Sequence, residues 1–260
     1  MLRNILFVLI FISQVSQAED YTIYLTFDDG PLGGTENILQ VLEEERVPAT
    51  FFMVGVHLDR CKNCQNLMRK IKKSQYVFLG NHSYSHAFGH YTRFYKDAKA
   101  VVKDMNKNNR TFGLKKEHIV YSRLPGRKVF RLPGVSSDDP YVPDWKNNYE
   151  KNVSEKLFNE DFYIFGWDHE WEHNNGVPIQ SVNKLIKEIE EKLESRTTTA
   201  DDELILLMHD QMFRTPQASK RLRQLIIRLK QKGYKFASIT DYTPALSNIE
   251  GFTNDIELGI

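Results

Sequence analysis

The 260-residue sequence lacks an excess of charge of either sign. Lysine and arginine total 35, aspartate and glutamate total 34, and the formal net charge at pH 7 is therefore +1. A protein that binds nucleic acid through its phosphates usually has a strong basic excess, so we expect no nucleic-acid partner. The chain is 41% hydrophobic and 27% charged, which is ordinary for a folded domain and excludes a disordered chain.

Cysteine is scarce, because Cys61 and Cys64 are the only two in the chain. A structural zinc site normally takes four ligands, and no second cysteine pair exists to complete one. A redox centre would need a thioredoxin-like setting around the Cys-Lys-Asn-Cys motif, and none is evident. We interpret the pair as a staple across a loop or as two free thiols. A redox protein remains an alternative, in which these cysteines would be essential.

Long apolar runs are also lacking beyond the N-terminus, so we expect no stable insertion into a membrane. At the N-terminus, Arg3 precedes an unbroken apolar run at residues 5–12, and Ser16-Gln17-Ala18 offers small residues two positions apart. This order is typical of a secretory signal, and an uncleaved anchor is the alternative. We expect residues 1–18 to be a signal peptide and residues 19–260 to be the exported domain, either periplasmic or secreted.

Strand-like and helix-like segments alternate along the rest of the chain. Apolar or alternating patterns predict strands at residues 21–27, 49–54, 76–79, 118–121, 162–167, 203–208 and 234–239. Helical spacing predicts helices at residues 35–45, 66–73, 94–106, 182–193 and 217–231. Thr35 is the expected N-cap of the first helix. The alternation predicts an α/β fold, a distorted (β/α) barrel of about seven strands, with a doubly wound open sheet as the alternative.

Polar side chains that could take part in catalysis or bind a metal follow the carboxyl ends of these predicted strands. In an α/β barrel this edge of the sheet holds the active site. The residues in question are Asp28, Asp29, His82, His86, Arg123, Asp168, Glu170 and His209.

Two of these residues, His82 and His86, have the spacing of metal ligands. If the segment is helical, both imidazoles project from one face and can share an ion. A carboxylate from Asp28 or Asp29 would complete the three-ligand set of an open catalytic zinc site, although other divalent metals could bind. The second carboxylate could then take a proton from metal-bound water. The alternative is that Asp28-Asp29-Gly30-Pro31 is a plain turn.

His209 ends the most apolar predicted strand, and it is either a core histidine or a proton donor to a leaving nitrogen. A nearby carboxylate, Asp168 or Glu170, would support the protonated imidazole. Arg123 could orient the basic aspartate through a bidentate pair.

Several motifs together resemble the polysaccharide deacetylases with a NodB-homology domain, carbohydrate esterase family 4. The resemblance spans roughly residues 21–239, and its two metal-site motifs agree in both order and spacing. The matching segments are Thr26-Phe27-Asp28-Asp29-Gly30-Pro31, Ala49-Thr50-Phe51-Phe52-Met53-Val54-Gly55, Asn81-His82-Ser83-Tyr84-Ser85-His86, Leu206-Leu207-Met208-His209-Asp210 and Gly233-Tyr234-Lys235-Phe236.

The resemblance implies a role for each matching polar residue. It implies Asp28 as general base and His209 as general acid, with Leu207 lining the pocket for the acetyl methyl group. The implied metal ligands are Asp29, His82 and His86. The bound ion is expected to be divalent, with Zn²⁺ the first choice, and would polarise the amide carbonyl and position the water.

Two motifs depart from the family pattern. The arginine motif of the family has an aromatic residue before its glycine, and both Arg123-Leu124-Pro125-Gly126 and Arg131-Leu132-Pro133-Gly134 lack it. We favour Arg123, which directly follows a strand. In the shortened Trp167-Asp168-His169-Glu170-Trp171, we prefer Asp168 as the partner of His209, with Glu170 as the alternative. Trp171 is the candidate to stack on a sugar ring, or else it closes the barrel.

The expected function is hydrolysis of N-acetyl groups on a polysaccharide or oligosaccharide that contains N-acetylglucosamine, such as peptidoglycan, a chitin-like glycan or a surface glycan. Acetyl esters, as on xylan, are the alternative within the same chemistry. A non-catalytic glycan-binding protein would have lost the base, the acid or a ligand, and none is lost here. We expect a monomer.

Overall fold

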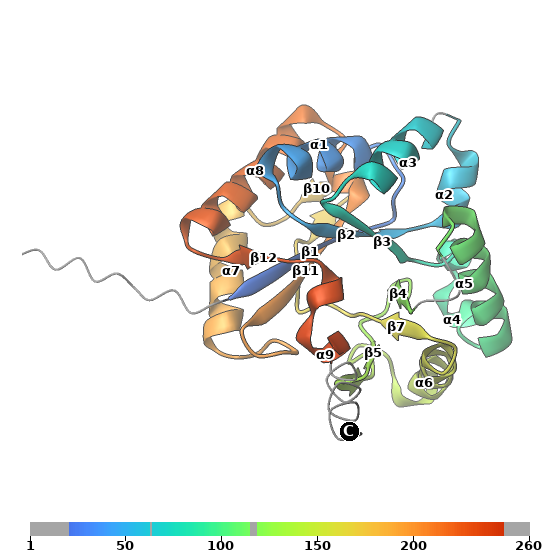
Figure 1. Ribbon diagram of the computed structural model, residues 1–260. Coiled ribbons are helices and arrows are strands. Elements are labelled where there is room, and N and C mark those ends of the chain that lie inside the picture. Colours follow the sequence, from blue (N-terminus) through green and yellow to red (C-terminus); the bar gives the residue numbers. More distant parts are fainter. Residues whose placement is uncertain (1–20, 63, 115–118, 247–260) are drawn as a thin grey trace, which may run out of the picture.

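The computed structural model describes residues 21–62, 64–114 and 119–246. Within these ranges, helices surround the outside of a curved sheet (Figure 1). The segment expected to be a signal peptide, residues 1–18, lies outside the described residues, as does His118. No helix in the described ranges is long and apolar enough to cross a membrane.

The sheet contains ten strands, and a separate pair forms a hairpin. The strands are β1 (Thr22–Asp28), β2 (Ala49–Met53), β3 (Val77–Asn81), β4 (Val120–Ser122), β5 (Phe130–Leu132), β6 (Val135–Ser137), β7 (Phe162–Ile164), β8 (His169–Glu170), β9 (His173–Asn174), β10 (Val177–Pro178), β11 (Glu203–His209) and β12 (Lys235–Phe236). The α-helices are α1 (Thr35–Glu45), α2 (Gly55–Arg60), α3 (Cys64–Lys73), α4 (Tyr91–Phe94), α5 (Ala98–Phe112), α6 (Asp144–Phe158), α7 (Val182–Glu194), α8 (Pro216–Gln231) and α9 (Thr243–Leu246).

Seven strands lie side by side in parallel, in the order β7-β4-β3-β2-β1-β11-β8. The short strands β5 and β6 extend this sheet antiparallel beyond β7, and β12 pairs with the start of β1. The predicted α/β architecture is confirmed, with ten strands in place of about seven. Among the described strands, no pairing joins β8 to the far edge, so the sheet curls without closing into a complete barrel.

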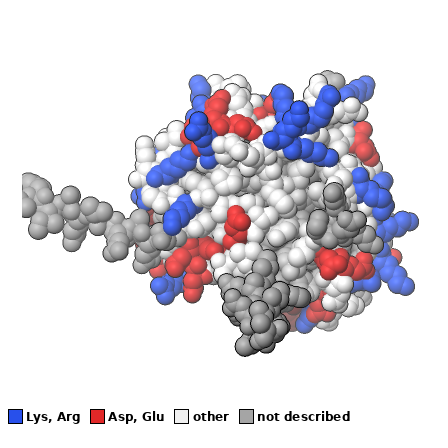
Figure 2. Space-filling model, in the orientation of Figure 1, with Lys and Arg blue, Asp and Glu red and all other residues white. Residues whose placement is uncertain are grey.

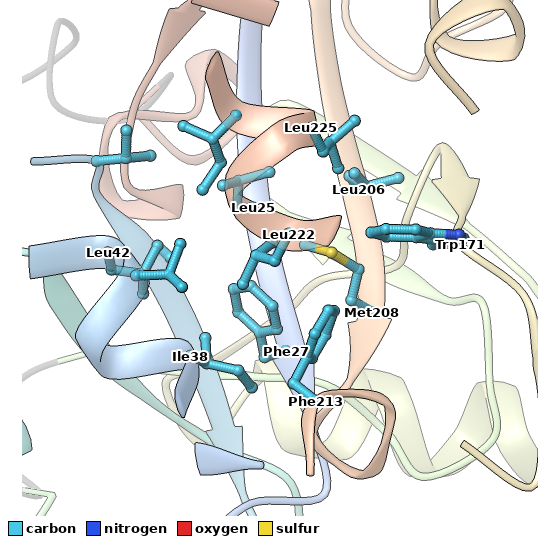
Figure 3. Packing of buried hydrophobic residues seen from close by; sticks show 14 of the residues in the cluster. Leu25, Phe27, Ile38, Leu42, Trp171, Leu206, Met208, Phe213, Leu222 and Leu225 are labelled. Atoms are coloured by element: carbon cyan, nitrogen blue, oxygen red, sulfur yellow. The ribbon is translucent and has the colours of Figure 1, made fainter. Parts of the chain in front are cut away.

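Alternation along β1 and β11 decides which residues face the helices and which face inward. Leu25 and Phe27 belong to the main core cluster beneath the outer helices, together with Leu206 and Met208 (Figure 3). The intervening residues, Thr26 and Asp28 on β1 and Leu207 and His209 on β11, face the inside of the curved sheet. The register pairs Asp28 with His209, so two predicted site residues meet at the same edge.

The helix predicted at residues 35–45 is confirmed at both ends, but its predicted N-cap is wrong. Gly34 occupies that position, and Thr35 is the first helical residue. The Thr35 hydroxyl accepts from the Leu32 amide and donates to the Asp210 carboxylate. A Cβ at Gly34 would lie 1.9 Å from the Asp210 carbonyl oxygen, so only glycine fits where α1 meets the end of β11.

Two further segments differ from the prediction. The helix expected at residues 94–106 is split into α4 and α5, because the Asp97 side chain accepts from the Ala100 amide and starts a new helix. Helix α6 was not predicted, since it contributes few apolar residues to the core, with Val153 and Leu157 fully buried. Cys61 and Cys64 form a disulfide between α2 and α3, as the staple interpretation predicted.

Candidate active site and metal centre

The paired aspartates point in different directions because the backbone turns sharply between them. Asp28 ends β1 in an extended conformation with its side chain 4% exposed. Asp29 has a φ of 75°, in the left-handed region that aspartate tolerates better than most residues. Its carbonyl oxygen lies 2.6 Å from His57 Nδ1. The turn thus separates the two carboxylates and allows them different roles.

His82 lies on the loop after β3, and His86 is the first residue of a short 3-10 helix (His86–Gly89), so the two do not share an α-helix and the helical condition stated for this pair is not met. Ser83 and His86 have positive φ values, 64° and 49°, which fold the loop back on itself. The Asp104 carboxylate holds the loop by accepting from the amides of Tyr84 at 2.8 Å and Ser85 at 3.1 Å. The two imidazole rings still meet, with their centroids 5.0 Å apart.

The three predicted ligands converge on one point. One ligand atom from each of Asp29, His82 and His86 lies within 4.8 Å of the other two. Asp29 Oδ1 is 3.1 Å from His86 Nε2 and 3.6 Å from His82 Nε2. This oxygen is buried, and no described residue donates a hydrogen bond to it. A buried carboxylate oxygen without a donor, facing two imidazole nitrogens, fits a divalent cation.

The surroundings keep these groups in the forms that bind a metal. His82 Nδ1 lies 2.8 Å from the Arg123 carbonyl oxygen, to which it donates, so Nε2 presents its lone pair to the site. Burial and the neighbouring His82 lower the pKa of His86 to about 4. Burial raises the pKa of Asp29, but the nearby histidines outweigh it and hold the value below its ordinary range. His86 is therefore neutral and Asp29 ionised at pH 7, which are the forms that bind a metal.

Arg123 contacts Asp28, and Arg131 lies elsewhere. Arg123 is fully buried, and its Nη1 donates to Asp28 Oδ1 at 3.0 Å. The predicted bidentate pair is wrong, because the remaining donors are used by Thr26 Oγ1 and the carbonyl oxygens of Phe165 and Gly166. Arg131 pairs with Asp138 and with nearby carbonyl groups around β5.

Glu170, rather than Asp168, is the carboxylate beside His209. His209 Nδ1 lies 3.8 Å from Glu170 Oε1, and burial raises the pKa of this glutamate. Asp168 accepts hydrogen bonds from the Thr199 amide, the Thr199 hydroxyl and the Ile205 amide, at 2.7, 2.7 and 2.8 Å. These bonds tie Asp168 to the start of β11, at the opposite end of the strand from His209. The preference for Asp168 is therefore corrected in favour of its alternative.

A sequence comparison shows which known proteins have this set of motifs. The sequence model of the polysaccharide deacetylases matches residues 16–140, just under half of the 260-residue chain. The chain resembles the polysaccharide deacetylase family over these residues.

Two relatives show how far this chain resembles known enzymes. A peptidoglycan-N-acetylglucosamine deacetylase of Bacillus cereus is 25% identical over 229 residues, covering 86% of this chain and 71% of the relative. A chitin disaccharide deacetylase of Vibrio alginolyticus is 24% identical, covering 86% and 71%. The catalytic domain of a peptidoglycan N-acetylglucosamine deacetylase from Eubacterium rectale superposes with a TM-score of 0.62 at 22% identity, covering 86% and 90%. The last likeness shows a shared fold.

The two predicted substrate contacts, Trp171 and Leu207, have different outcomes. Trp171 is wholly buried, packs edge-on against Phe213 and donates from Nε1 to the Gln180 carbonyl oxygen. It cannot stack on a sugar ring, and instead it closes the core (Figure 3). Leu207 is 2% exposed on the inner face of β11, two residues before His209, and its place in an acetyl pocket stays a prediction.

Sequence reasoning missed two histidines that lie against the site. His57 contacts the carbonyl of Asp29, and the ring of His173 lies against that of His209, with centroids 4.9 Å apart. Neither directly follows a predicted strand, because His57 lies within α2 and His173 begins β9, so the positions of strand ends did not indicate them. The chain's small total of 8 histidines was the available hint, because three others had already been assigned to the site.

Proposed function

We propose that this chain hydrolyses N-acetyl groups on a polysaccharide containing N-acetylglucosamine, in a reaction that depends on a divalent metal. The observation that carries the proposal is the position of Asp28. Its carboxylate lies beside the candidate ligands, with Oδ2 3.5 Å from His82 Nε2, yet it has a separate partner in Arg123. A ligand cluster with an independently held carboxylate at its side is the arrangement that metal-assisted amide hydrolysis requires.

Asp29, His82 and His86 would hold the ion, and the set of two imidazoles and one carboxylate favours Zn²⁺ among divalent metals. When bound, such an ion polarises the substrate carbonyl and makes a water more acidic. The chain itself supplies the ligand forms, because the Arg123 carbonyl fixes the tautomer of His82 and burial keeps His86 neutral.

Asp28 is the general base in this proposal. Arg123 occupies Oδ1, which leaves Oδ2, on the side of His82, to accept a proton from the attacking water. The Arg123 guanidinium is locked by Thr26 and two carbonyl oxygens, so it positions the carboxylate rigidly. Attack of the water on the acetyl carbonyl carbon then forms the new carbon–oxygen bond.

His209 is the general acid. It lies directly opposite Asp28 in the register of β1 and β11, and Glu170 lies near its Nδ1. The carboxylate of Glu170 gives a protonated imidazole an ionic partner. His209 would donate this proton to the amide nitrogen as the carbon–nitrogen bond breaks, which leaves acetate and a free amine on the sugar.

The substrate class and location of this activity are part of the proposal. By their names, the two relatives mentioned above deacetylate peptidoglycan N-acetylglucosamine and a chitin disaccharide, which supports an N-acetylated glycan over an acetyl ester. The signal-like start of the sequence supports export, since such polymers lie outside the cytoplasm. Base, acid and all three ligand residues are present, so nothing favours the non-catalytic alternative.

Measurement of released acetate tests the proposal. The purified protein, treated with a chelator and then with Zn²⁺, is incubated with peptidoglycan, chitooligosaccharides and acetylated xylan. We expect acetate and new free amines from an N-acetylated glycan, and a loss of about 100-fold or more in Asp28→Asn. Asp201→Asn, at an exposed turn before β11, is the matched control. Absence of acetate from all three polymers, or full activity in Asp28→Asn, would overturn the proposal.

A further inference from the structure

A short hairpin brings a second imidazole against His209. The strands β9 and β10 pair antiparallel, and His173 is the first residue of β9. Its ring meets that of His209 at an angle of 76°, edge to face, with centroids 4.9 Å apart. The hairpin lies close to the chain that follows β11, because a Cβ at Gly176 would be 2.7 Å from the Gln211 carbonyl oxygen. Gly176 has a φ of 82° in the hairpin turn, which also favours glycine.

The ring of His173 is held from both of its nitrogen atoms. Nδ1 accepts from the Gly176 amide at 3.2 Å, and Nε2 lies 3.2 Å from the side-chain amide of Gln211. Because Nδ1 accepts, the neutral ring has its hydrogen on Nε2. The atom 3.2 Å from it is Gln211 Nε2, itself a donor, so this contact is a hydrogen bond when the Gln211 amide is rotated by 180° to present its oxygen. Burial, together with the nearby His209, lowers the pKa of His173, which favours this neutral form.

His209, in contrast, has little else to fix the orientation of its ring. Its Nδ1 is buried, and no described residue forms a hydrogen bond with it. Glu170 lies 3.8 Å away, beyond hydrogen-bond distance, and the His209 side chain is 20% exposed. A proton donor must keep its nitrogen within reach of the leaving atom, so a ring with few polar contacts depends on packing to hold it.

We propose that His173 is a positioning residue that holds the His209 ring in its working orientation through the ring contact. The inference rests on the proposed role of His209 as general acid. His173 itself contacts no metal ligand in this arrangement and donates no proton to the substrate. The Gly176 amide of the hairpin and the Gln211 side chain after β11 contact the ring of His173, and this ring packs against that of His209.

Steady-state kinetics on the proposed glycan provide the first test. We expect His173→Ala to lower kcat by about 10- to 100-fold with KM and zinc content unchanged, as for other residues that orient catalytic groups. His173→Phe keeps a ring against His209 and should recover most of kcat. His169→Ala is the matched control, because His169 lies on β8 and bonds Glu188 at 3.0 Å, away from His209. An unchanged kcat in His173→Ala, or His173→Phe as slow as His173→Ala, would overturn the inference.

A second measurement does not depend on enzymatic activity. Diethyl pyrocarbonate modifies accessible imidazoles, and mass spectrometry of the peptide that contains His209 reports its rate of modification. Loss of the His173 ring should expose and free His209, so the rate should rise several-fold in His173→Ala but not in His169→Ala. If the wild-type protein releases no acetate, the proposed function fails, and the modification rate still decides the inference. Equal rates in all three proteins would refute it.

Discussion

Replacement of Arg123 by methionine tests whether this guanidinium is present to pair the carboxylate of Asp28. Arg123 is fully buried, and its Nη1 lies 3.0 Å from Asp28 Oδ1. Methionine fills much of the same space but donates no hydrogen bond. The carboxylate of Asp28, whose side chain is 4% exposed, would then lack its cationic partner.

The magnitude follows from this separation and burial. Two opposite unit charges 3.0 Å apart attract by about 5 kcal/mol at an effective dielectric constant of about 20. Removal of one partner from a buried pair typically costs about 3–5 kcal/mol, because the other charge stays buried. We therefore expect Arg123→Met to lower the free energy of unfolding by about 3–5 kcal/mol. Addition of Asp28→Asn removes the stranded charge, so the double variant should be more stable than Arg123→Met alone.

Urea unfolding of the metal-free proteins at pH 8 measures these free energies, with a chelator present so that metal binding does not contribute. Arg131→Met is the matched control, since Arg131 is also buried but pairs with Asp138 and not with Asp28. In the Arg131→Met background, Asp28→Asn should change the free energy of unfolding by the same amount as in the wild type. A double variant of Arg123→Met and Asp28→Asn that is less stable than Arg123→Met would refute the reasoning.

Two further predictions concern stability. Burial raises the pKa of Asp210 from 3.8 to about 6, so the native state keeps a proton that the unfolded chain has released between these values. The stability that Asp210 contributes should therefore fall by about 3 kcal/mol as pH rises through this window. Asn does not titrate, so the free energy of unfolding of Asp210→Asn should increase relative to that of the wild type between pH 4 and 6. A difference that stays constant with pH would contradict this. Trp171→Ala should cost about 3–5 kcal/mol in urea unfolding with KM unchanged, whereas an increase in KM alone would restore its role as a sugar contact.

The parts of the fold that rest on long apolar segments could be predicted from the sequence. Strand β11 has a continuous apolar pattern and β1 an alternating one, and their ends at Asp28 and His209 locate the edge of the sheet that holds the candidate site. Helix α1 was also found at its correct bounds from its spacing. Because parallel strands end at one edge of the sheet, Asp29, His82 and His86 could be expected to lie close together. They do so although His82 and His86 do not lie on an α-helix.

The remaining parts depend on short elements that leave no periodic pattern. Strand β8 has only two residues, so the sequence could not show that Glu170 faces His209 while Asp168 bonds to Thr199. A strand this short has no alternating pattern that would indicate that the neighbouring Trp171 packs into the core. His173 was missed because it belongs to a two-stranded hairpin outside the main sheet.

Arg123 serves the site through two chemically separate parts. Its guanidinium pairs with Asp28, while its backbone carbonyl accepts from His82 Nδ1. Every side-chain substitution at this position keeps the carbonyl, so a side-chain variant can remove the partner of the proposed base while it leaves the orientation of His82, a candidate metal ligand, intact. The second contribution is invisible to an alanine scan, and only a change to the backbone itself, such as replacement of an amide by an ester, would weaken that carbonyl as an acceptor.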